Sequence, residues 1–71
     1  MIEDPKVEEL AQEMVATVVA PTDDEKDIHH ARVFKLVKEL PRPKRQRAIK
    51  LGRALLAEHH AIERAERYLN R

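Results

Sequence analysis

A cluster of basic side chains in the middle of this 71-residue chain has the clearest potential for chemistry. Between residues 32 and 53, nine bases stand against the single acid Glu39, which gives this segment a net charge of +8. Clustered lysines and arginines of this kind neutralise nucleic-acid phosphates and release their counterions. The side chains that we predict to contact a nucleic-acid backbone are Lys35, Lys38, Arg42, Lys44, Arg45, Arg47, Lys50 and Arg53.

The uneven charge also allows a protein partner. Residues 1–31 carry nine acids against two lysines, a net charge of −7, so an acidic protein could dock on the basic segment or a basic one on the acidic third. The only aromatic residues are Phe34 and Tyr68, which argues against a surface that stacks bases. Any nucleic acid is therefore expected to be a duplex contacted through its backbone, and both hypotheses remain open.

Four histidines invite a test for metal binding. Glu25 with His29, and His59 with Glu63, have the four-residue spacing that places two ligands on one helix face. If the chain turns back near residue 41, His59 lies level with Glu25. However, adjacent histidines point about 100° apart on a helix, and the Glu-x-x-His motif of di-metal bundles does not occur. We expect no metal site, and instead an assembly that responds to acid through its histidines.

Catalysis has little support in the sequence. The chain has no cysteine, no serine and no glycine-rich phosphate loop, and a chain of this size has little room for a deep pocket. We therefore predict a small non-enzymatic regulatory or accessory protein that needs no cofactor. No apolar run approaches the roughly 20 residues of a membrane span, so we expect a cytoplasmic location and no membrane partner.

The elements that must position these residues are all helical. One glycine and two aromatic residues among many Ala, Leu, Glu, Lys and Arg residues favour an all-α fold. Asp4-Pro5 and Thr22 are helix-start signals, and the prolines at 21, 41 and 43 separate the segments. We predict helices over about 5–20, 23–40 and 43–70 within one domain, 1–71. The expected architecture is a three-helix up-down-up bundle with a long C-terminal helix.

The long helix also suggests self-association. A chain of 71 residues without disulfides is near the lower size limit for a stable core. The helix over 43–70 is longer than its neighbours, so its far end needs another cover, which a second copy would supply. Gly52 within its apolar stripe would allow another backbone to approach closely. The residues that we predict to form a homo-oligomer interface are Leu55, Leu56, Ile62, Ala65 and Leu69.

Overall fold

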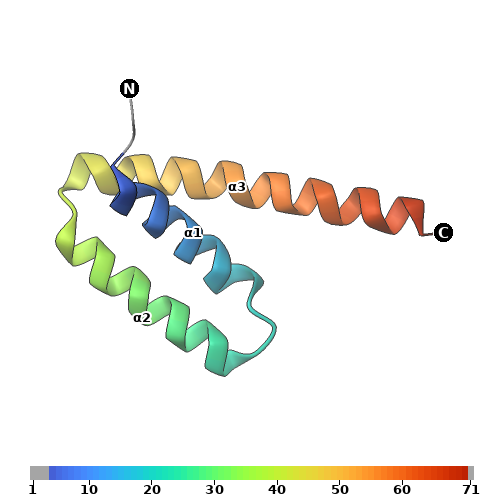
Figure 1. Ribbon diagram of the computed structural model, residues 1–71, viewed down its shortest axis with the longest axis horizontal. Coiled ribbons are helices and arrows are strands. Elements are labelled where there is room, and N and C mark those ends of the chain that lie inside the picture. Colours follow the sequence, from blue (N-terminus) through green and yellow to red (C-terminus); the bar gives the residue numbers. More distant parts are fainter. Residues whose placement is uncertain (1–3, 71) are drawn as a thin grey trace.

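A computed structural model describes residues 4–70, and this part of the chain folds into three α-helices (Figure 1). Helix α1 spans Pro5–Val19, α2 spans Asp23–Glu39 and α3 spans Arg42–Leu69. Each end lies within one residue of its predicted position, and the described residues contain no strand. The predicted all-α bundle with a long C-terminal helix is confirmed. Residues 1–3 and 71 of the predicted domain lie outside the described range.

Local capping explains where the first two helices begin. Asp4 caps α1 by accepting a hydrogen bond from the Lys6 amide at 2.9 Å, with Pro5 in the first turn, where its missing amide proton costs little. Thr22 caps α2 by accepting from the Glu25 amide at 3.2 Å. The predicted start signals at both helices are therefore confirmed, and each satisfies a backbone donor that the helix itself leaves without a partner.

The corner between α2 and α3 consists of two extended residues. Leu40 has φ −106° and ψ 139°, and Pro41 has φ −68° and ψ 157°, so neither continues a helix. Helix α3 then begins at Arg42, one residue earlier than predicted, because Pro43 is tolerated in the first turn of a helix.

Helix α1 lies between the other two and packs against both. From the corner, α2 and α3 run in diverging directions, and α1 occupies the space between them (Figure 1). The core therefore centres on α1: its Val7 and Leu10 are fully buried and cluster with Leu36, Leu40 and Ala48. A chain that turns back near residue 41 would place α2 and α3 side by side, but they hardly touch each other because α1 separates them.

Gly52 lies at a close approach between α1 and α3. A Cβ atom placed on Gly52 would lie 3.6 Å from the Ala11 carbonyl oxygen and 3.8 Å from the Ala11 Cα. The neighbour is thus a backbone, as predicted, and α3 continues through Gly52 as a single helix.

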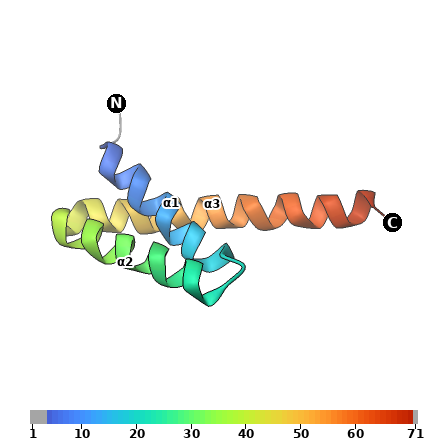
Figure 2. The same cartoon turned by 60° about the horizontal axis from the view of Figure 1, so that its bottom comes forward.

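The second half of α3 extends beyond the ends of α1 and α2, as predicted (Figures 1 and 2). We call residues 57–69 the overhang. Its large apolar side chains are exposed: Ile62 by 56% and Leu69 by 82%. None of the described helices has the length and apolar character that crossing a membrane requires.

Candidate nucleic-acid interface

The outward face of α3 carries a row of basic side chains. Ala48 and Gly52 are buried against α1, and with about 100° per residue the opposite face holds Arg42, Lys50 and Arg53, all of which are exposed. Within residues 4–70, these three side chains take part in no ion pair. The acids of α3 are Glu58, Glu63 and Glu66, and none of them shares this face. The result is a positively charged row without local neutralisation.

Arg64 extends this row and was missed by the charge count, because residues 54–71 have zero net charge. It is exposed and lies eleven residues after Arg53, which is close to three helical turns and so the same face. That spacing was the signal that could have revealed it. We call Arg42, Lys50, Arg53 and Arg64 the basic ridge. From first to last it spans about 33 Å along the helix axis.

Two of the predicted contact residues are instead part of the fold. The Lys44 ammonium lies 2.6 Å from Asp4 Oδ2, and the Arg45 Nε donates to the Leu40 carbonyl oxygen at 3.0 Å. Both side chains are half-buried. The hydrogen bond from Lys44, together with that from the Lys6 amide, holds the pKa of Asp4 below its usual value of 3.8. Lys44 and Arg45 therefore fasten the start of α3, and the Lys44 charge is paired with that of Asp4.

The remaining predicted bases do not join the ridge. Arg47 is exposed on the flank of α3, about 60° from Lys50 and about 120° or more from Arg53 and Arg42. Lys35 and Lys38 are exposed on α2, which diverges from α3. Lys35 also borders a hollow that is lined by two acids and two bases, Glu9, Glu39, Arg32 and Lys35 itself. Of the eight predicted side chains, Arg42, Lys50 and Arg53 thus share one exposed face of α3, and Arg47 borders it beside Lys50.

Three of the four histidines, all except His30, lie beside a carboxylate. His29 Nδ1 lies 2.7 Å from Glu13 Oε2 on α1, rather than beside Glu25 on its own helix. His59 Nε2 lies 2.9 Å from Glu63 Oε1. Because α2 and α3 diverge, His59 does not face Glu25. Within the described residues, no group of three potential ligands could hold a metal ion.

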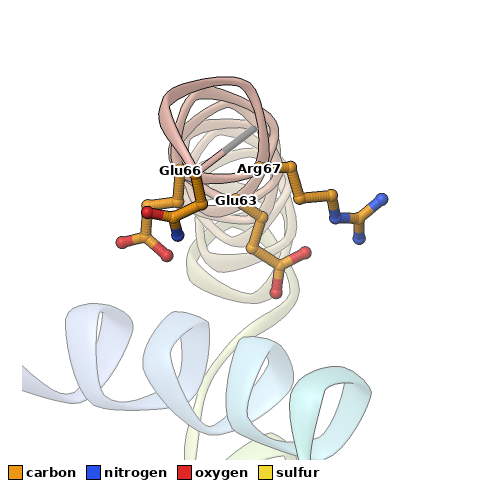
Figure 3. A pocket seen from close by; sticks show the side chains of 4 residues that line it. Glu63, Glu66 and Arg67 are labelled. Atoms are coloured by element: carbon orange, nitrogen blue, oxygen red, sulfur yellow. The ribbon is translucent and has the colours of Figure 1, made fainter.

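Two surface hollows border the overhang. One lies between α1 and α3, has a volume of about 160 Å³, and is smaller than the roughly 300 Å³ of typical ligand pockets. Its lining is Met14, Val15, Val18, Ile49, Gly52, Arg53 and Leu56. The other is formed by Glu63, Glu66 and Arg67 of α3 and by Asn70, which follows it. Figure 3 shows the side chains of Glu63, Glu66 and Arg67 spreading outward from this one helix.

The predicted oligomer residues lie along the second half of α3 with graded exposure. Leu55 and Leu56 are half-buried near the end of α1, whereas Ile62, Ala65 and Leu69 are exposed on the overhang.

Comparison of the chain with protein-family models, curated proteins and solved structures gave no match. Function is therefore inferred from the side chains and their geometry alone.

Proposed function

We propose that this protein is a non-enzymatic accessory factor that binds the phosphate backbone of duplex nucleic acid through the basic ridge of α3. The observation that carries the proposal is the exposure of Arg42, Lys50 and Arg53 on one helix face, with no acid on that face and no ion pair within residues 4–70. A row of uncompensated cations gains binding energy by releasing counterions from phosphates.

The shape of α3 supports the same function. The ridge spans about 33 Å, similar to the roughly 34 Å rise of one duplex turn, and the protruding helix offers few neighbours that would obstruct a rod-like partner. No aromatic residue lies between Arg42 and Arg64, the two ends of the ridge, and Tyr68 follows beyond it. Contacts of this kind position a protein on the backbone and read little sequence.

Fluorescence anisotropy of a random-sequence DNA duplex, titrated with the protein across a salt series, tests this function. Four ridge contacts predict a slope of log K against log salt near −3.6, because each neutralised phosphate contributes about −0.9. Micromolar binding with such a slope would support the proposal. An anisotropy that stays flat at low salt would overturn it.

A second candidate function is self-association or protein interaction, and the exposed apolar face of the overhang favours it. Ile62 and Leu69 are 56% and 82% exposed, which leaves large apolar side chains in water. In this function Leu55, Leu56, Ile62, Ala65 and Leu69 form an interface, the ridge docks an acidic partner, and the acidic α1 docks a basic one. Light scattering at micromolar concentration distinguishes a dimer from the 8.3 kDa monomer.

A further inference from the structure

We propose that two copies of this chain pair through their overhangs in an antiparallel arrangement, with a two-fold axis beside Ile62. The inference rests on the self-association function proposed above and specifies its partner and geometry. It does not depend on nucleic-acid binding.

The pairing surface continues the face of α3 that α1 already covers. Positions 48, 55, 62 and 69 recur every seven residues and form one stripe. Along this stripe exposure rises as α1 ends: Ala48 is fully buried, Leu55 is half-buried, Ile62 is 56% exposed and Leu69 is 82% exposed. The chain thus repeats a core pattern over a stretch where it supplies no core of its own.

The overhang forms the last 13 residues of the 28-residue helix α3, and its Ile62 and Leu69 side chains are exposed. Most helical stability in proteins comes from packing of an amphipathic face, which the described residues do not supply to this stretch. A helix of equal length and the same stripe would cover it, and the overhang of a second copy is such a helix.

The spacing of the stripe favours a pairing that is symmetric about Ile62. Leu55 and Leu69 each lie seven residues from Ile62. When two overhangs run in opposite directions with their Ile62 residues level, Leu55 of each copy lies level with Leu69 of the other. All three apolar layers are then filled at once. The exposed tip of one helix reaches the half-buried end of the stripe, beside the last turn of α1.

Charge distinguishes the antiparallel arrangement from a parallel one. His59 and Glu66 are seven residues apart on the same flank of the stripe. Antiparallel pairing about Ile62 brings His59 of each copy level with Glu66 of the other, so the His–Glu contact forms twice. Parallel pairing would instead set this flank against the opposite flank of the other helix, so the His59–Glu66 contact would not form. Figure 3 shows Glu66 and Arg67 pointing to different sides of α3, and within residues 4–70 the Glu66 carboxylate has no ion pair.

Disulfide trapping tests the geometry directly, because the chain contains no cysteine. Single variants Leu55→Cys, Ile62→Cys and Leu69→Cys are oxidised alone and in pairs, and the products are read on a non-reducing gel. Antiparallel pairing predicts that Ile62→Cys links to itself, and that Leu55→Cys links to Leu69→Cys when the two are mixed. Ala57→Cys, on the outward face, is the matched control and should remain monomeric. Circular dichroism confirms that each variant is helical.

Other results would overturn the proposal in distinguishable ways. Self-linking of Leu55→Cys without linking to Leu69→Cys would indicate parallel pairing, which retains self-association and discards this geometry. A monomeric mass for the unmodified protein would discard both. A charge exchange provides a second measurement: Glu66→Lys should weaken the dimer roughly fivefold, and adding His59→Glu should restore it. Failure of the second change to restore pairing would contradict the His59–Glu66 contact.

Discussion

Lys44 and Asp4 join the start of α3 to the start of α1, with the ammonium nitrogen 2.6 Å from Oδ2 of the carboxylate. The other oxygen of Asp4 accepts the Lys6 amide and caps α1. One carboxylate thus begins one helix and anchors another, across 40 residues of sequence. A lysine that charge clustering assigns to nucleic-acid binding is held by the fold.

The first prediction concerns the acid sensitivity that this contact confers. The Lys44 and Lys6 hydrogen bonds lower the pKa of Asp4 below 3.8, so its stabilisation is present above about pH 4 and is lost as pH falls through the lowered pKa. Asp4→Asn keeps a capping oxygen but removes the charge. We expect lower stability at neutral pH and a flatter stability profile between about pH 5 and 2, measured by urea unfolding. An unchanged profile would show that the Asp4 charge contributes nothing.

The second prediction is that Gly52→Ala stabilises the protein. The added Cβ would meet its nearest atoms at 3.6 to 3.8 Å, which is ordinary van der Waals contact. Alanine is favoured over glycine inside a helix by up to about 1 kcal/mol, and we expect a gain of that order in thermal or urea unfolding. Gly52→Leu, whose longer side chain would press on α1, should destabilise. A loss of stability in Gly52→Ala would mean that α1 and α3 approach more closely than these distances indicate.

Local signals explain how much of the fold could be predicted from the sequence. Helix ends depend on nearby residues: the side chains of Asp4 and Thr22 accept hydrogen bonds from amides two or three residues later, and the ring of Pro41 fixes an extended backbone. The helix ends can therefore be predicted from the sequence without knowledge of the fold. The overhang followed from helix length, and the close approach at Gly52 from the missing side chain. The position of α1 between α2 and α3 could not be predicted from the sequence, because it depends on which apolar faces of the three helices pack together.

The same packing decides which charged side chains make contacts within the fold. Whether Lys44 is available depends on residue 4 lying beside it, and no spacing in the sequence expresses that contact. The four-residue interval from Glu25 to His29 suggested a pair on one helix. Instead, α1 presents Glu13 to His29, and a contact between two helices replaced the local one.

The third prediction concerns Glu13, which contacts two side chains of α2, His29 and Arg32. His29 Nδ1 lies 2.7 Å from one Glu13 oxygen, and Arg32 Nη1 lies 3.4 Å from the other. Because the His29 contact is shorter and Arg32 is 59% exposed, we expect unequal coupling. Double-mutant cycles with alanine, followed by urea unfolding, should give about 1 kcal/mol for Glu13–His29 and under about 0.5 kcal/mol for Glu13–Arg32. Equal couplings would contradict this ranking.

The fourth prediction separates the basic ridge from net charge. Arg42→Gln, Lys50→Gln and Arg53→Gln together remove three exposed cations that have no ion pair in residues 4–70. Duplex affinity should fall, and the magnitude of the salt slope should drop by about 3, because each lost phosphate contact reduces it by about 1. Circular dichroism should show unchanged helicity, since none of the three side chains is buried.

The matched control removes the same number of charges from α2, as Lys26→Gln, Lys35→Gln and Lys38→Gln. These lysines are also exposed, but they lie on a helix that diverges from α3. If the ridge is the binding surface, this variant should keep most of the affinity and most of the salt slope. An equal loss in both triple variants would mean that the duplex responds to overall charge, and the ridge would lose its special role. A loss confined to the α2 variant would move the site to Lys35 and Lys38.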